Sequence, residues 1–133
     1  MTNKRIILKA GKEKSVLHHH PWIFSGAVAS TSGDPLPGET VEVLSSSGEH
    51  LAWAAYSPHS SIRARVWSFN PDEVINEEYF YRKIQDAARL RKVIKVTDET
   101  NAFRLVHGEA DGVPGLIVDC YPDVSVVQIL SAG

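Results

Sequence analysis

Hydrophobic and polar positions alternate with a period of two along residues 62–69, the spacing that places neighbouring side chains on opposite faces of a strand. One face is small and mostly apolar, which suits the inside of a narrow barrel: Ile62, Ala64, Val66 and Ser68. The other face carries two guanidinium groups and two rings: Arg63, Arg65, Trp67 and Phe69. Guanidinium groups pair with phosphates and rings stack on unpaired bases, so this face is suited to single-stranded or looped RNA. The eight residues alone are also compatible with a solvated edge strand whose arginines lie over its own rings.

The same pattern predicts four further strands before residue 62, at residues 5–9, 22–28, 39–44 and 51–56. One or two helical turns are expected within residues 12–18, and they must end before Pro21, because a proline disfavours helical geometry at the preceding residue. Residues 45–49 indicate a hairpin, and residues 31–38 have the composition of a loop. Five or six short strands and one small helix in about 70 residues predict a compact barrel.

A longer helix is predicted to begin after Asn76, an N-cap residue that acidic residues follow. Helical spacing predicts one buried stripe, made of Phe80, Ile84, Ala87, Leu90 and Ile94. The other face is basic, and we interpret it as a solvated surface that pairs with Glu78 and Asp86: Arg82, Lys83, Arg89 and Lys92. Strands are predicted after the helix at residues 103–107, 116–120 and 124–130. The predicted fold class is therefore mixed and mainly β, a barrel followed by a helix and a short antiparallel meander.

Charge is distributed unevenly along the 133 residues, although the net charge is only −2. Residues 1–24 hold five Lys or Arg and one Glu, which gives +4, whereas residues 98–133 hold one Arg and six acidic groups, which gives −5. A polyanionic partner such as RNA is therefore expected at the first part of the chain. Neither a membrane-spanning run nor a signal segment is present, so a cytoplasmic protein is expected. Cys120 is the only cysteine, which excludes an internal disulfide, and we expect a buried, inert thiol.

The densest meeting of basic and aromatic residues lies at residues 12–26. The rings of Trp22 and Phe24 are predicted to point into the core, which leaves the cations for contact with phosphate. We predict five RNA contacts from charge and face: Lys12, Lys14, His20, Arg63 and Arg65. No metal site is expected at residues 18–20, because the side chains of adjacent histidines diverge and no carboxylate is close in sequence.

Glu109 and Asp111 are two carboxylates in a loop that also contains Gly108, Gly112 and Gly115. Such a pair could serve acid–base catalysis or bind a divalent cation. The alternative is that the glycines serve turn geometry while the carboxylates are solvated or cap backbone amides. The loop lacks the lysine and spacing of a phosphate-binding loop, and a glycine-rich βαβ unit for a dinucleotide or methyl donor is absent from the sequence.

Three ordered motifs together resemble the large-subunit (23S) ribosomal RNA methyltransferases that make 5-methylcytosine. They are Lys14-Ser-Val-Leu…His20-Pro-Trp-Ile-Phe-Ser-Gly-Ala-Val28, Ala55-Tyr-Ser-Pro58…Ile62-Arg-Ala-Arg-Val-Trp67 and Arg104-Leu…Gly108-Glu-Ala-Asp-Gly-Val-Pro-Gly-Leu…Asp119. The resemblance implies that residues 1–71 form a PUA domain, an RNA-binding pseudobarrel. It implies that residues 72–133 open a middle α/β module called EEHEAD.

The same family binds S-adenosylmethionine in a third, Rossmann-like domain that also holds the catalytic cysteines. That domain should begin beyond Gly133, and Cys120 matches neither cysteine motif of the family, so no catalytic residue is expected in this chain. The leading hypothesis is the RNA-docking portion of such an enzyme, with ribosomal RNA as partner and no cofactor of its own. Two alternatives stay open: a complete small enzyme that uses Glu109 and Asp111, and a protein–protein module, with a homodimer among the options, that presents Trp67 and Phe69 as exposed anchors.

Overall fold

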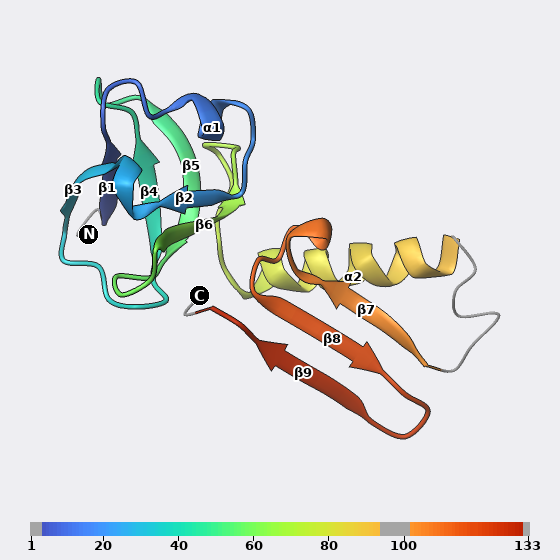
Figure 1. Ribbon diagram of the computed structural model, residues 1–133. Coiled ribbons are helices and arrows are strands. Elements are labelled where there is room, and N and C mark those ends of the chain that lie inside the picture. Colours follow the sequence, from blue (N-terminus) through green and yellow to red (C-terminus); the bar gives the residue numbers. More distant parts are fainter. Residues whose placement is uncertain (1–3, 94–101, 132–133) are drawn as a thin grey trace. The chain divides into compact units, whose positions relative to one another are not determined.

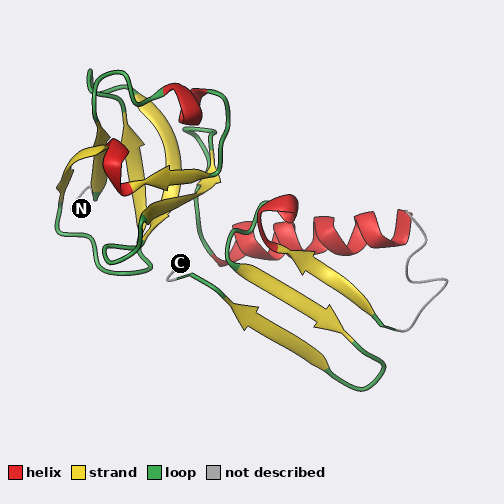
Figure 2. Ribbon diagram, viewed as in Figure 1, coloured by secondary structure: helices red, strands yellow, loops and turns green. Residues whose placement is uncertain are grey.

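The computed structural model describes residues 4–93 and 102–131, and they divide into two compact units. The first unit extends to Glu73 and the second comprises Val74–Ser131. The first is a curled β-sheet, and the second is a helix with a small antiparallel sheet (Figure 1, Figure 2). The predicted fold class, mixed and mainly β, is confirmed. Within the described ranges, the structure contains no helix that is long and apolar enough to cross a membrane.

Six strands form the sheet of the first unit, in the spatial order β2-β6-β5-β4-β1-β3. Their bounds are β1 Arg5–Leu8, β2 Trp22–Phe24, β3 Val28–Ser32, β4 Thr40–Leu44, β5 His50–Tyr56 and β6 Ile62–Ser68. β1 pairs in parallel with β4, and the other neighbours are antiparallel. The predicted first helix is short, α1 at Lys14–Leu17, and a 3₁₀ turn at Ser25–Ala27 separates β2 from β3. The single extended segment predicted over residues 22–28 is thus broken at Gly26.

The core of the first unit comes from the inward positions of its strands, as the alternating pattern predicts. In β6, Ala64 is fully buried and Val66 is only 4% exposed. The residues of the core cluster are Ile6, Leu8, Val16, Ile23, Val41, Val43, Ala52, Ala54, Tyr56, Ala64 and Val66. Alanine occupies three of these positions on β5 and β6, and small side chains there allow the sheet to curl tightly.

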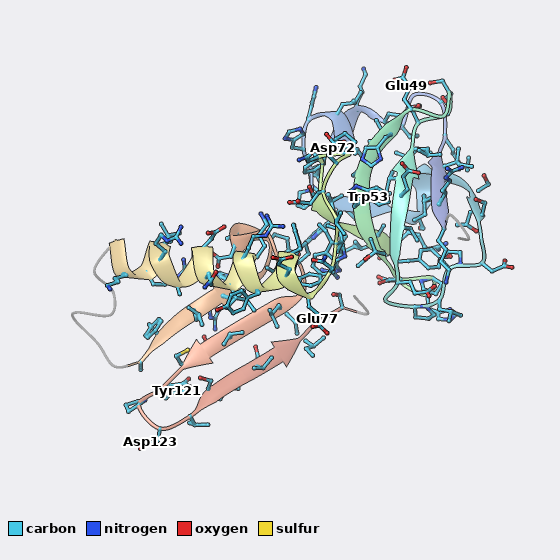
Figure 3. The ribbon with its side chains drawn as sticks, turned by 180° about the vertical axis from the view of Figure 1, so that it is seen from behind. Glu49, Trp53, Asp72, Glu77, Tyr121 and Asp123 are labelled. Atoms are coloured by element: carbon cyan, nitrogen blue, oxygen red, sulfur yellow. The ribbon has the colours of Figure 1, made fainter. Side chains whose placement is uncertain are left out.

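The second unit contains α2 (Glu77–Val93) and the sheet β7-β8-β9, with α2 along one face (Figure 2). The strands are β7 Phe103–His107, β8 Leu116–Cys120 and β9 Ser125–Ile129, all antiparallel. Asn76 caps the helix as predicted, because its Oδ1 accepts the N–H of Tyr79 at 2.9 Å. Figure 3 shows Glu77 at the start of the helix and Tyr121 and Asp123 at the β8–β9 turn.

The buried stripe of α2 differs from the prediction. Tyr79 and Ala87 are 1% and 3% exposed, whereas Ile84 and Leu90 are 36% and 47% exposed. Ile94 lies outside the described residues. The stripe is rotated toward Tyr79, since helical spacing alone does not record which side of a helix the neighbouring sheet covers.

Gly115 offers a direct test of the packing in the second unit. Its φ is +83°, and a Cβ at this position would lie 2.1 Å from Ser131 Oγ and 2.8 Å from Ser131 Cβ. Gly115→Ala should therefore destabilise this unit by roughly 1–2 kcal/mol from the backbone conformation, before the collision is counted. Native-state hydrogen exchange of the β8 and β9 amides measures this, since protection there should fall. Gly26→Ala is the matched control, because a Cβ at Gly26 meets no atom within 4 Å; equal effects of the two substitutions would contradict the prediction.

Candidate nucleic-acid interface

Two rings of β2 face outward, contrary to the prediction from sequence. Ile23 is 2% exposed and packs in the core, whereas Phe24 on one side of it is 50% exposed and Trp22 on the other is half-buried. The prediction that both rings point inward is therefore wrong. All three residues of Trp22–Phe24 are apolar, so the sequence pattern does not show which side chain points into the core. Pairing with β6 determines this, because Ile23 lies opposite the buried Ala64.

The outward face of β6 carries the two arginines, as predicted from the alternation. Arg63 and Arg65 are half-buried on either side of Ala64, and Arg65 lies opposite Trp22. The guanidinium carbon of Arg65 is 5.6 Å from the centre of the Trp22 ring, within the range of a cation–π contact. Arg63 Nε donates to the carbonyl of Ser60 at 3.4 Å. Arg65 therefore lies over a ring of the neighbouring strand β2.

Trp67 and Phe69 do not form the exposed pair that the pattern suggested. Trp67 is only 8% exposed, and Phe69 packs against the core cluster while its ring stacks on that of His19 at 4.2 Å. The register of β6 with β5 shifts at Trp67, so the strict alternation does not extend to the end of the strand. The prediction of Trp67 and Phe69 as exposed anchors of a protein–protein module is therefore wrong.

His20 lies beside the β2 rings. Its Nδ1 lies 3.1 Å from the backbone nitrogen of Trp22 and 3.3 Å from the Trp22 carbonyl oxygen, so the ring contacts the backbone of β2 through this nitrogen. The ring centre of His20 is 6.2 Å from that of Trp22 and 6.4 Å from that of Phe24. His20 is exposed, so its ring lies at the surface next to the ring pair. The structure thus brings together three of the five predicted contacts: His20, Arg63 and Arg65.

Lys12 and Lys14 are both exposed, Lys12 in the loop before α1 and Lys14 at its first residue. Glu13 between them turns its carboxylate to the β4–β5 turn, where it accepts from Ser46 N at 3.2 Å and Ser46 Oγ at 2.9 Å. The α1 helix contacts β2 and β5, so Lys14 is carried by an element that packs against the ring-bearing strand. We refer to the five contacts predicted from the sequence, Lys12, Lys14, His20, Arg63 and Arg65, together as the cationic surface.

The carboxylate of Glu13 should hold this loop in a pH-dependent way. The hydrogen bonds from the Ser46 backbone and hydroxyl lower the pKa of Glu13 below its ordinary value of 4.5. A lowered pKa in the folded state means that the attachment stabilises the fold above about pH 4.5 and is lost as the pH falls through the lowered value. We expect exchange of the Ser46 amide to accelerate with acid in the wild type. In Glu13→Gln, the protection of the Ser46 amide from exchange should not change as the pH falls below about 4.5. If this variant loses protection with acid as the wild type does, the Glu13 carboxylate is not the group that holds the loop.

Asp111 and Glu109 do not form a catalytic carboxylate pair. The side chain of Asp111 is 5% exposed and accepts from Arg91 Nη2 at 2.8 Å and from the His107 N–H at 2.6 Å. Glu109 is exposed. A carboxylate neutralised by a buried guanidinium and a backbone amide is unsuited to act as a base. The geometry favours the alternative, in which Asp111 caps the backbone and fixes the Gly108–Gly115 loop.

Two further predictions concern metal and thiol chemistry. Among residues 4–93 and 102–131, the structure has no group of three or more His, Cys, Asp and Glu side chains that could hold a metal ion. Cys120 on β8 is half-buried and accepts a hydrogen bond from Ser125 Oγ at 3.6 Å. The expectation of a buried thiol is therefore wrong, because Cys120 lies at the end of its strand beside the exposed β8–β9 turn.

Comparison with known proteins first identifies the class of the barrel. Residues 6–69 match the family described as PUA-like domain, and this range contains all six strands of the first sheet apart from Arg5. The fold of the first unit is therefore that of a PUA-like pseudobarrel, as the resemblance implies.

The most specific matches extend beyond the barrel. The chain is 51% identical over 129 residues to the ribosomal RNA large subunit methyltransferase I of Yersinia pseudotuberculosis and to that of Yersinia pestis. Each match covers 97% of this chain and 33% of the relative, so the chain spans about a third of the length of these relatives. The resemblance to ribosomal RNA methyltransferases is thus confirmed at the level of sequence.

Solved structures show the same fold. A Streptococcus mutans protein that has been proposed to be a SAM-dependent methyltransferase superposes with a TM-score of 0.79 at 20% identity, covering 96% of this chain and 33% of that protein. A second structure, of a proposed methyltransferase in complex with SAH, superposes with a TM-score of 0.78 at 20% identity, covering 96% of this chain and 32% of that protein.

Proposed function

We propose that this chain is the RNA-docking portion of an S-adenosylmethionine-dependent methyltransferase that modifies C5 of a cytosine in large-subunit ribosomal RNA. In this proposal, residues 1–71 are the RNA-binding domain and residues 72–133 open the middle module. The observation that supports it most directly is the cationic surface on β2, β6 and the α1 loop of a PUA-like domain. Its cations supply phosphate contacts that position the RNA, and a cytoplasmic location follows from a ribosomal substrate.

The described residues do not fit S-adenosylmethionine. A methyl-donor fold needs parallel strands joined through a helix with a glycine-rich first turn, whereas the sheet of the second unit is entirely antiparallel. The one parallel pair of the first unit, β1 with β4, is not joined by a strand–helix–strand crossover, because β2 and β3 intervene. Methyl transfer is therefore assigned to the whole protein, and this chain contributes binding and orientation.

Phosphate docking is tested by the salt dependence of RNA binding. In a filter-binding titration with a ribosomal RNA hairpin, the logarithm of the affinity should fall linearly with the logarithm of the salt concentration. Lys12→Ala/Lys14→Ala should reduce the slope by about 1.4, since each lost contact to a single strand removes about 0.7. Arg89→Ala/Lys92→Ala is the matched control, because it removes the same charge from exposed positions of α2. An affinity that does not change with salt would overturn the proposal.

A further inference from the structure

The charges of the cationic surface do not explain why the aromatic rings of β2 lie at the exterior. We propose that Trp22 and Phe24 form a stacking site for one unpaired RNA base, and that the domain therefore prefers looped or single-stranded RNA to a complete duplex. The inference rests on the proposed RNA-docking function and adds the structural class of the RNA to it. The rings proposed to stack on RNA are thus those of β2, and not Trp67 and Phe69 at the end of β6, which the sequence pattern suggested.

The rings of β2 meet edge to face, and that of Phe24 leaves flat surface at the exterior. The centres of Trp22 and Phe24 are 6.4 Å apart with an interplanar angle of 82°, and the rings of His20 and Trp22 meet at 72°. In such edge-to-face contacts one ring uses its edge and the other its face, so the rings support one another without closing into a parallel stack. The ring of Phe24 is half exposed, although it lies next to the buried Ile23. It contacts the rings of Trp22 and His20 and is half exposed to solvent, as a stacking platform requires.

A guanidinium group lies over Trp22 across the strand pair, because Arg65 is opposite Trp22 and its guanidinium carbon is 5.6 Å from the centre of that ring. The register shifts between Ile23 and Phe24, so that Arg63 is the extra residue of β6 in the part of the strand that pairs with the end of β2 (β2 and β6 run side by side in Figure 1). An unpaired nucleotide presents a flat base and, in the same nucleotide, a phosphate group. A ring beside a guanidinium is complementary to both.

The size and surroundings of the platform favour a nucleotide over a protein partner. Its exposed apolar surface is one half-exposed ring and part of a second, whereas a specific protein interface buries about 800 Å² on each partner. The same strands and α1 also carry three cations, Lys14, Arg63 and Arg65, besides the exposed Leu17 of α1. A small aromatic surface surrounded by cations matches a base with its phosphates.

The test uses a hairpin RNA with 2-aminopurine in its loop and the same strand annealed into a full duplex. Stacking on a ring changes 2-aminopurine fluorescence, so binding and stacking are read separately by anisotropy and by intensity. The wild type should bind the hairpin more tightly than the duplex and should change the fluorescence intensity. Phe24→Leu keeps the apolar bulk but removes the π face, and it should weaken hairpin binding by about tenfold and abolish the intensity change. Phe24→Tyr should restore both, and Leu36→Ala, at another exposed apolar position of the same unit, should change neither.

The outcomes separate this inference from the proposed function. Equal affinity for hairpin and duplex, both dependent on salt, with no effect of Phe24→Leu, would overturn the stacking site and leave phosphate docking intact. Absence of salt-dependent binding to either RNA would overturn the proposed function and the inference with it. A Phe24→Leu variant that binds RNA normally but loses self-association in sedimentation would show that the rings serve a protein contact, which also overturns the inference. Far-UV circular dichroism of each variant verifies that the barrel is folded.

Discussion

Replacing Asp111 with alanine should destabilise the second unit by roughly 3–5 kcal/mol, the range observed when one partner of a buried ion pair is removed. Two oxygens of Asp111 accept from Arg91, at 3.3 Å and 2.8 Å, and Oδ2 also accepts the His107 N–H at 2.6 Å. The side chains of Arg91 and Asp111 are 13% and 5% exposed, respectively, so water cannot replace the lost carboxylate acceptor. The substitution therefore leaves a charged guanidinium and a backbone donor buried without their acceptor. The loss is a large fraction of the total stability of a small domain, about 5–15 kcal/mol.

Urea unfolding combined with amide exchange of the β7 and β8 strands measures this loss. Asp111→Asn keeps an acceptor for the His107 N–H but removes the charge, so it should cost less than Asp111→Ala. Arg89→Ala is the surface control, because its pairing with Asp86 is long, at 3.6 Å, and exposed, and should contribute less than about 1 kcal/mol. If Asp111 were a catalytic base, its removal would leave stability nearly unchanged; a loss below about 1 kcal/mol would therefore contradict the structural role.

The backbone architecture was largely predictable, because period-two alternation and capping are local signals. The strand at residues 62–68, the hairpin at 45–49 and the cap at Asn76 all follow from neighbouring residues. Elements that depend on a partner were less predictable. The buried stripe of α2 depends on which side of the helix the sheet covers, and the break at Gly26 separates two strands that pair with different partners, β6 and β1. Neither feature is encoded in a short window of sequence.

In the candidate site, too, the side-chain directions that depend on neighbouring residues were predicted correctly, and those that depend on long-range pairing were not. The outward direction of Arg63 and Arg65 follows from the burial of Ala64 between them, so this part was predicted correctly. Trp22 and Phe24 were assigned to the core because large rings are usually buried. Their exposure depends on the long-range register that places Ile23 opposite Ala64. A signal was present in the sequence, since basic residues precede the Trp-Ile-Phe segment closely, but only pairing with β6 shows that cations and rings share one face.

Removing both arginines of β6 should weaken RNA binding on the order of a hundredfold at moderate salt. Hydrogen bonds to charged groups contribute about 1.5–3 kcal/mol each, and the effective loss is reduced by the remaining cations. The salt slope of Arg63→Ala/Arg65→Ala should also fall by about 1.4. Ala64 and Val66 keep their inward positions in this variant, so the core of the barrel is retained. Filter binding across a salt series gives the affinity and the slope in one experiment.

Lysine at the same positions separates charge from planar geometry. Arg65→Lys keeps the positive charge, so the salt slope should be that of the wild type. Its ammonium cannot reproduce the planar contact with the Trp22 ring or a two-pronged bond to phosphate, so affinity should still fall, and by less than in Arg65→Ala. Arg89→Ala/Lys92→Ala on α2 removes equal charge elsewhere and should bind RNA like the wild type. If that control lost affinity while Arg63→Ala/Arg65→Ala did not, the RNA would bind the second unit, and the β2–β6 surface would no longer be the docking site.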